Sequence, residues 1–249
     1  MKELIHTSPV VEAFLSADEC PFCRLERDSE QRAIRFFAGA GASYMEPTIR
    51  GITNRQGFCG CHMKKLYDYG NALGNALMLQ THLEDILLDL QRLEESRTEP
   101  EKKSLFRKKS AEAPADWQHL QQRQESCAIC QRVEESQQRH YRVFFSLLKE
   151  AEFRGYVAQS KGFCLRHYAA MLQEAENHLP HSQADWFYPT VRRVMAENLL
   201  RVKQDLDLLI RKYDYRNAEL PWGNSRDSLQ RAMQKLSGIY PADPTYRKD

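Results

Sequence analysis

Two short patterns occur twice in the chain and decide how it must fold. The first half contains Cys20-Pro-Phe-Cys23 and then Gly57-Phe-Cys-Gly-Cys-His62. The second half contains Cys127-Ala-Ile-Cys130 and then Gly162-Phe-Cys-Leu-Arg-His167. Each half therefore contains C-x2-C followed by G-F-C-x2-H, with 35 and 33 residues between the second cysteine of the first motif and the cysteine of the second motif. Such self-similarity at a nearly fixed spacing indicates an internal duplication.

The residue types in these motifs are those that bind a soft metal ion. Two sulfurs of a C-x2-C motif can converge on one ion. In C-x2-H at the start of a helix, the cysteine and histidine share a face, and the free backbone amides there favour the thiolate form. Three thiolates and one imidazole form the closed tetrahedral site that is typical of structural zinc. The sequence therefore predicts two zinc ions and these ligands: Cys20, Cys23, Cys59, His62, Cys127, Cys130, Cys164 and His167.

Several alternatives stay open at this point. An iron–sulfur cluster also uses cysteine thiolates, although histidine ligands are uncommon in such clusters. A thioredoxin-like dithiol would need a βαβ pattern, which the sequence lacks. Each ion could take its ligands within one half, which is the simpler arrangement, or across the two halves. Cys61, which is replaced by Arg166 in the second half, is either a spare thiolate or, as we favour, a packed cysteine.

The rest of the sequence predicts an all-α protein, a helical bundle with two similar metal-binding halves. Apolar residues recur at steps of three and four nearly throughout, and no stretch shows the alternation of a strand. We expect a first repeat over residues 1–98, a charged linker over 99–114, and a second repeat with C-terminal helices over 115–249. The longest predicted helix covers residues 59–95 and buries a leucine-rich stripe, and the Gly- and Pro-containing segment 39–51 is expected to be irregular.

Composition limits the possible partners. Hydrophobic residues make up 42% of the chain, enough for a packed core, and the formal net charge is only +2. Nucleic acid is therefore an unlikely partner, because phosphate binding normally leaves a clear basic excess. No stretch reaches the length of a transmembrane helix, and residues 1–15 do not resemble a signal peptide. We expect a cytoplasmic protein that binds another protein, with an oligomeric state that the sequence leaves unknown.

No catalytic signature is evident. The sequence contains no Ser–His–Asp set, phosphate loop or dinucleotide fingerprint, and we assign no catalytic residue. Glu46 and Arg50 could form a polar site before the first G-F-C motif, but an ordinary Glu–Arg pair is the simpler interpretation. Whether the protein is an enzyme stays open, and a redox or electron-transfer role is the alternative to a structural zinc protein.

The duplicated motifs occur together with Lys-Tyr-Asp-Tyr-Arg-Asn at residues 212–217 and with Pro221-Trp-Gly223. Over nearly the whole chain this combination resembles an uncharacterised bacterial family that is known only as a domain of unknown function. The resemblance implies a bacterial cytoplasmic protein. It implies no activity or substrate and no functional residue beyond the cysteines and histidines themselves.

Overall fold

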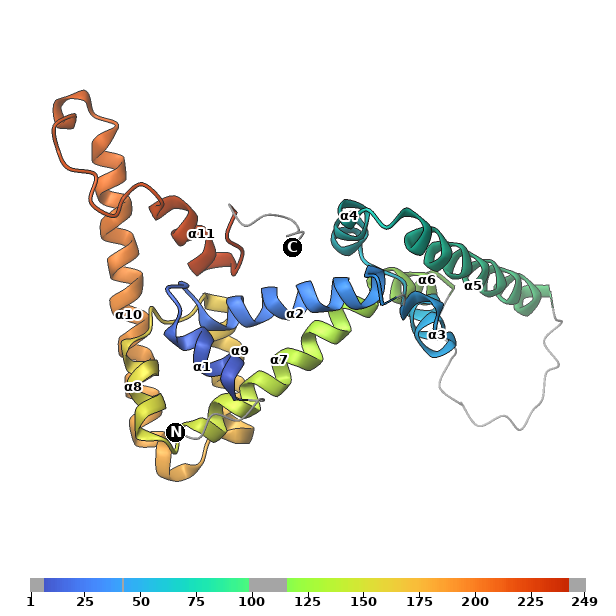
Figure 1. Cartoon of the computed structure of the whole chain (residues 1–249), viewed down its shortest axis with the longest axis horizontal. Coiled ribbons are helices and arrows are strands. Elements are labelled where there is room, and N and C mark those ends of the chain that lie inside the picture. Colours follow the sequence, from blue (N-terminus) through green and yellow to red (C-terminus); the bar gives the residue numbers. More distant parts are fainter. Residues whose placement is uncertain (1–6, 42, 99–115, 242–249) are drawn as a thin grey trace. The chain divides into compact units, whose positions relative to one another are not determined.

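A computed structural model describes residues 7–41, 43–98 and 116–241. These residues form α-helices and two short 3-10 helices, without any strand (Figure 1), so the predicted all-α class is confirmed. Within the same ranges, no helix has both the length and the apolar character needed to cross a membrane. The expected charged linker, residues 99–114, lies outside the described residues.

The chain divides into two compact units, and each takes segments from both sequence halves. Two long helices, α2 (Pro21–Ala38) and α7 (Ala128–Leu147), each contribute residues to both units. Of the described residues, unit 1 contains 7–29 and 134–241, and unit 2 contains 30–41, 43–98 and 116–133. Besides its parts of α2 and α7, unit 1 contains α1 (Ser8–Leu15), α8 (Ala151–Gln159), α9 (Leu165–His178), α10 (His181–Lys212), η2 (Tyr215–Asn217) and α11 (Ser228–Ser237). Unit 2 likewise contains η1 (Ser43–Met45), α3 (Pro47–Gln56), α4 (Gly60–Tyr69), α5 (Ala72–Thr98) and α6 (Asp116–Glu125).

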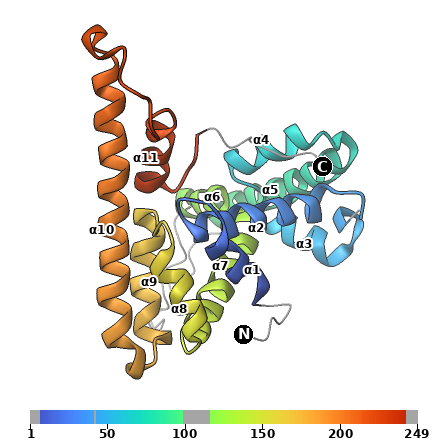
Figure 2. The same cartoon turned by 60° about the vertical axis from the view of Figure 1, so that its left-hand side comes forward.

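The two units repeat one plan. Helices that occupy the same place in the order of motifs correspond to each other. Helices α1 and α6 precede the two C-x2-C motifs, α8 and α3 precede the two G-F-C-x2-H motifs, and α9 with α10 corresponds to α4 with α5. Among the described elements, α11 and η2 belong to unit 1 and have no counterpart in unit 2. In Figure 2, α11 lies beside the long helix α10. It contacts both α10 and α9. The duplication is therefore visible in the structure, with one additional helix in unit 1.

The core of unit 1 is built on phenylalanine side chains. Phe144 is fully buried and its ring contacts those of Phe14, Phe22 and Phe153. Most of these ring pairs meet edge to face, an arrangement that aromatic quadrupoles favour. The core of unit 2 is smaller and centres on Ile34, Phe37, Met78 and Ile129.

The structure corrects three sequence-based expectations of helix boundaries. The predicted helix 59–95 is two helices, because Gly70 ends α4 in a left-handed conformation (φ 85°) and Asn71 caps α5 by accepting a hydrogen bond from the Gly74 amide at 2.9 Å. The segment 39–51, expected to be irregular, contains the start of α3. Apolar residues also recur at helical spacing over 127–153 and predict one helix there, but α7 ends at Leu147 and α8 follows after a three-residue turn.

The buried leucine stripe predicted along 59–95 is also wrong. Leu66 is buried, but Leu73, Leu83, Leu87 and Leu90 of α5 are exposed. The residue of α5 that lies deepest in the core of unit 2 is Met78. The apolar periodicity of α5 therefore reflects an exposed helix face as well as a buried one.

Removing the Phe144 ring tests the core of unit 1. Phe144→Ala should lower the free energy of unfolding by about 3–5 kcal/mol, because the change leaves a cavity among fully buried rings. Denaturant titration followed by circular dichroism would measure it. Leu200→Ala on α10, where the side chain is 54% exposed, is the matched control and should change stability little. Equal effects of the two substitutions would contradict this description of the core.

Candidate metal centres

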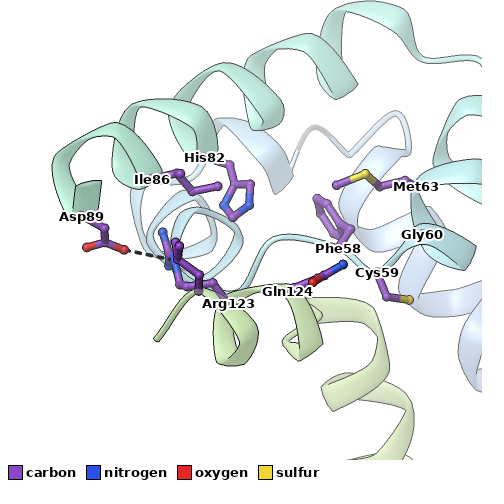
Figure 3. Close-up of a pocket in the computed structure, with 10 residues that line it drawn as sticks. Phe58, Cys59, Gly60, Met63, His82, Ile86, Asp89, Arg123 and Gln124 are labelled. Carbon is purple, nitrogen blue, oxygen red and sulfur yellow. Dashed lines mark ion pairs between the residues drawn. The ribbon is translucent and has the colours of Figure 1, made fainter. Parts of the chain in front are cut away.

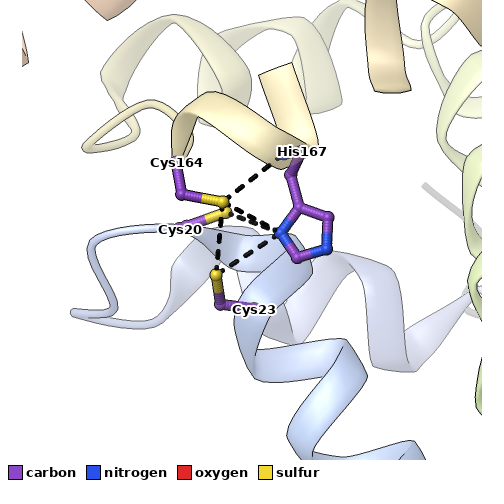
Figure 4. A group of neighbouring side chains, drawn as sticks. All are labelled: Cys20, Cys23, Cys164 and His167. Atoms are coloured by element: carbon purple, nitrogen blue, oxygen red, sulfur yellow. Dashed lines mark hydrogen bonds between the residues drawn. The ribbon is translucent and has the colours of Figure 1, made fainter. Parts of the chain in front are cut away.

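Unit 1 brings Cys20, Cys23, Cys164 and His167 together in a group that we call site A (Figure 4). Their ligand atoms all lie within 4.8 Å of one another. The Nδ1 atom of His167 lies 3.5, 3.4 and 3.2 Å from the sulfurs of Cys20, Cys23 and Cys164, and the sulfurs of Cys23 and Cys164 are 3.6 Å apart. All four residues are buried. Three sulfurs and one ring nitrogen thus surround one point, where a metal ion could be held.

Unit 2 brings Cys59, His62, Cys127 and Cys130 together in the same way, in a group that we call site B. The Nδ1 atom of His62 lies 3.3 Å from each of the three sulfurs, and the sulfurs of Cys59 and Cys130 are 3.8 Å apart. This group is more accessible than site A, since Cys130 is exposed and Cys59 partly exposed. All eight residues singled out by the sequence are thus gathered into two groups that could each hold a metal ion.

The grouping crosses the two sequence halves. The C-x2-C motif of the first half meets the G-F-C-x2-H motif of the second half in site A, and the opposite exchange forms site B. The simpler expectation, in which each half forms its own group, is therefore wrong. The physical reason is that α2 and α7 are long and each has residues in both cores, so the residues that follow either helix belong to the other unit.

Every motif lies at the N-terminus of a helix. Cys59 and Cys164 are the N-cap residues of α4 and α9, and the His167 amide donates a hydrogen bond to the Cys164 sulfur at 3.4 Å. Cys20 and Cys127 directly precede α2 and α7. The second ligand of each motif follows three residues later, on the same face of the first turn. Each site therefore lies between two helix N-termini, whose partial positive charges stabilise thiolates.

The Gly-Phe pair before Cys59 and Cys164 explains how α4 and α9 are placed. Gly57 and Gly162 both adopt positive φ values, 57° and 77°. A Cβ atom at Gly57 would lie 2.5 Å from the His82 ring of α5, so only glycine fits there. The phenylalanine that follows is buried in the core of its unit. These two residues thus fix the N-terminus of the ligand-bearing helix against the core.

The histidines are oriented by contacts to their second ring nitrogen. Glu30 lies 3.0 Å from Nε2 of His62, and Lys65 holds the same carboxylate at 2.6 Å. At site A the Glu26 carboxylate and the Gln137 amide nitrogen lie 3.6 and 3.5 Å from Nε2 of His167. At site B this contact has the length of a hydrogen bond, so the Glu30 carboxylate keeps the proton on Nε2 of His62 and leaves Nδ1 free to bind a metal ion, as metal-bound histidines commonly require.

The electrostatics of both groups favour a bound cation. Hydrogen bonds to Cys164 and Cys20, together with burial, raise the pKa of the Cys23 thiol. Hydrogen bonds from Cys20, Cys23 and His167 outweigh burial and lower the pKa of the Cys164 thiol. Burial opposes protonation of His62, but contacts with Cys127 and Glu30 outweigh it and raise its pKa to about 10. Three thiols this close cannot all ionise without a compensating positive charge, which a metal ion supplies.

Two other candidates from the sequence lie outside these groups. Cys61 is exposed, so its interpretation as a packed cysteine is wrong. Glu46 is exposed, and the hydrogen bond found between Glu46 and Arg50 is the backbone bond of a helix start, at 2.8 Å. Among the described residues, no side-chain pairing joins them, so the structure lends no support to a polar site there.

Unit 2 also contains a cavity of about 360 Å³ beside site B, between α4, α5 and α6 (Figure 3). Phe58, Met63 and Ile86 line its apolar part, and the Cys59 sulfur points away from these side chains. Its arginine, Arg123, is engaged by Asp85 at 2.6 Å and Asp89 at 3.2 Å. The sequence had not indicated this cavity. Because Asp85 and Asp89 neutralise the charge of Arg123, the described residues that line the cavity offer no unpaired arginine to an anionic ligand.

Fold and site together define the class: an all-α protein with two groups of three cysteines and one histidine, each of which could hold a metal ion. The chain belongs to a family of unknown function (DUF6062), whose model matches residues 1–243. The family resemblance drawn from the duplicated motifs is thereby confirmed. Neither a curated protein nor a solved structure matches the chain.

The contact between Glu30 and His62 generates a testable prediction. Glu30→Ala should weaken the affinity of site B for a metal ion by about 10–100-fold, because the imidazole loses the carboxylate that orients it. Competition with a chelator of known zinc affinity would measure this. Glu94→Ala, at an exposed position of α5, is the matched control and should leave the affinity unchanged. If both variants bound zinc like the wild type, Glu30 would have no orienting role.

Proposed function

We propose that sites A and B each hold one structural zinc ion. Zinc lies about 2.3 Å from thiolate sulfur and about 2.0 Å from imidazole nitrogen, so a tetrahedral site has sulfur–sulfur edges of about 3.8 Å and sulfur–nitrogen edges of about 3.5 Å. The corresponding distances are 3.6 and 3.8 Å between sulfurs, and 3.2 to 3.5 Å between sulfur and nitrogen. This agreement with the geometry of a single four-coordinate ion is the observation that carries the proposal.

An iron–sulfur cluster fits these distances less well. In a cluster the cysteines bind different iron atoms that are bridged by sulfide, so the ligands lie farther apart than ligands of one ion. Four ligand atoms within 4.8 Å of one another leave no room for such a core. A single iron would fit the same space, but a closed set of three thiolates and one imidazole favours zinc.

The proposed role of zinc is to hold each unit together. Site A joins α2 to α9 through residues more than 140 positions apart, and site B joins α4 to α7. All four positions of each ion would be occupied by protein, so none is left for a substrate. The free energy of metal binding is then free energy of folding. Because the ligands must stay reduced, we also propose a cytoplasmic location.

Metal analysis tests this proposal directly. The purified protein should contain two zinc ions per chain, and Cys20→Ser and Cys127→Ser should each reduce this to one and unfold the unit concerned. Elemental analysis and circular dichroism would measure both effects. Cys61→Ser, which removes the cysteine outside both groups, is the control and should keep two ions. A metal-free protein with unchanged helicity and melting temperature, or a protein containing iron and sulfide, would contradict the proposal.

We further propose that the protein acts as an interaction module, with the exposed face of α5 as the contact surface. The side chains of Leu73, Leu83 and Leu87 are 69%, 59% and 58% exposed. Monomeric proteins rarely expose so many large apolar side chains along one helix, and such faces commonly mark protein–protein contacts. The partner is therefore expected to be a protein.

The spacing of this face fits a second copy of the same helix. Exposed residues follow one another at alternating steps of three and four, as in a coiled-coil seam: Leu73, Ala76, Gln80, Leu83, Leu87 and Leu90. In an antiparallel pair centred between Gln80 and Leu83, Leu73 faces Leu90 of the other copy and Ala76 faces Leu87. The face is thus complementary to itself, as a two-fold symmetric dimer requires.

Charged residues in the seam should abolish this association. The double substitution Leu83→Glu and Leu87→Glu should give a monomer at concentrations where the wild type is a dimer, since two carboxylates per chain would be buried without partners. Analytical ultracentrifugation, with zinc content measured in parallel, would test this. Leu200→Glu, at an exposed leucine of α10, is the control and should leave the dimer intact. A wild type that stays monomeric over the whole concentration range would rule out the second copy as partner.

A further inference from the structure

Helix α11 covers site A. At the C-terminal end of this helix the carbonyl oxygen of Gly238 lies 3.3 Å from the Cys23 sulfur. Gly238 has a φ of 82°, and a Cβ atom there would lie 3.4 Å from the Cys164 sulfur. The three cysteines of site A are fully buried and His167 is 3% exposed. The thiolates of site A are therefore shielded from solvent by a segment outside the ligand motifs.

The covering helix is held by a buried lysine. Lys235 is only 1% exposed, and its ammonium group donates to the carbonyl oxygens of Glu19, at 2.5 Å, and of Lys161. It also lies 3.3 Å from the Glu19 carboxylate. Glu19 directly precedes Cys20, and Lys161 directly precedes Gly162. Lys235 thus fixes α11 to both motifs that build site A.

In the part of the chain that the structure describes, site B has no such cover. The positions corresponding to Glu19 and Lys161 are Ser126 and Gln56, and the Ser126 hydroxyl donates to the Gln56 carbonyl at 2.7 Å. The Gln56 carbonyl, which corresponds to the carbonyl that accepts from Lys235 at site A, therefore already accepts a hydrogen bond from Ser126. Among the described residues of unit 2, no helix corresponds to α11. Two cysteines of site B consequently reach solvent: Cys130 is exposed and Cys59 is partly exposed.

We propose that Cys130 is an oxidation site at which a peroxide converts site B, but not site A, to a disulfide and releases its zinc ion. The proposal rests on the zinc assignment made above. The Cys130 thiolate attacks one peroxide oxygen, so that an S–O bond forms, the O–O bond breaks and hydroxide leaves. The Cys59 thiolate then attacks the resulting sulfenic sulfur, so that an S–S bond forms and the second hydroxide leaves. Two thiolates thus lose two electrons, which reduce one peroxide, and zinc keeps its charge.

The exposure of Cys130 and Cys59 and the distance between their sulfurs favour these two cysteines for the reaction. Cys130 is the exposed thiolate of the group, and oxidation of cysteine follows thiolate character and exposure. The Cys59 sulfur lies 3.8 Å away and is partly exposed, whereas Cys127 is buried. Once the disulfide forms, one thiolate and one imidazole remain, and these are too few to hold zinc tightly. Site A contains the same ligands, but its sulfurs are shielded by α11.

The experiment compares the two sites within one chain. A Cys61→Ser protein, in which every remaining cysteine is a proposed ligand, is first shown to contain two zinc ions. One equivalent of hydrogen peroxide should then release one zinc ion per chain, detected with a chromogenic chelator. Peptide mapping should find a disulfide between Cys59 and Cys130 and reduced cysteines at site A. The rate with unsubstituted Cys61 should be the same within about twofold.

A second variant tests the role of the cover. Lys235→Ala removes the group that fixes α11, so peroxide should release the second zinc ion as well, at least tenfold faster than in the parent protein. If this variant fails to fold, the comparison of the two sites in the parent protein still decides the proposal. Release of both ions at one rate, retention of both, or a disulfide that excludes Cys59 would overturn it while leaving the zinc assignment intact. A protein that contains no zinc before oxidation would overturn the zinc assignment itself.

Discussion

The convergence of two helix N-termini on each cysteine–histidine group is the constraint on which the rest of the structure depends. A tetrahedral ion with three thiolates carries a net negative charge, which is costly inside a protein unless dipoles or donors offset it. Four helices start at these groups, with the first ligand directly before the first helical residue and the second ligand three residues later. Their free amides point at the thiolates and offset that charge. The three-residue spacing of the ligands and the direction of each helix, with its N-terminus toward the group, therefore serve the same purpose: both place thiolates next to free backbone amides.

This requirement, together with helix length, explains why the two halves exchange ligands. Helix α2 has 18 residues and carries the chain about 27 Å from Cys20. Its last turns pack Ile34 and Phe37 into the same core as Phe58, so the motif that follows α2 joins the core at the far end of that helix. The same holds for α7, which has 20 residues and ends among the phenylalanines of unit 1. Two long helices that each begin with a pair of ligands are therefore sufficient to explain why each group combines motifs from both sequence halves.

Much of the site could be predicted from the sequence, because metal ligands repeat at fixed spacing. The eight residues, their position at helix starts and the all-α class all follow from local pattern. The pairing could not be predicted, because both G-F-C-x2-H motifs are chemically equivalent and spacing does not distinguish them. The break at Gly70-Asn71 was missed although both residues are typical of helix ends, because the apolar periodicity continues through it. The exposure of the α5 leucines could not be predicted, because apolar residues at helical spacing show that a helix has an apolar face but not which part of the protein packs against that face.

The difference between the two sites follows from a few residues outside the motifs. Both groups contain the same atoms at nearly the same distances, so the ligands alone would give them the same chemistry. What differs is the donor to the backbone carbonyl of the residue before the Gly-Phe pair. At site A, Lys235 of α11 donates to the Lys161 carbonyl, and at site B the Ser126 hydroxyl donates to the Gln56 carbonyl. The first solution brings a helix over the sulfurs, and the second leaves them open. The additional helix α11, fixed by Lys235 to that carbonyl, is therefore what distinguishes the shielded centre from the accessible one.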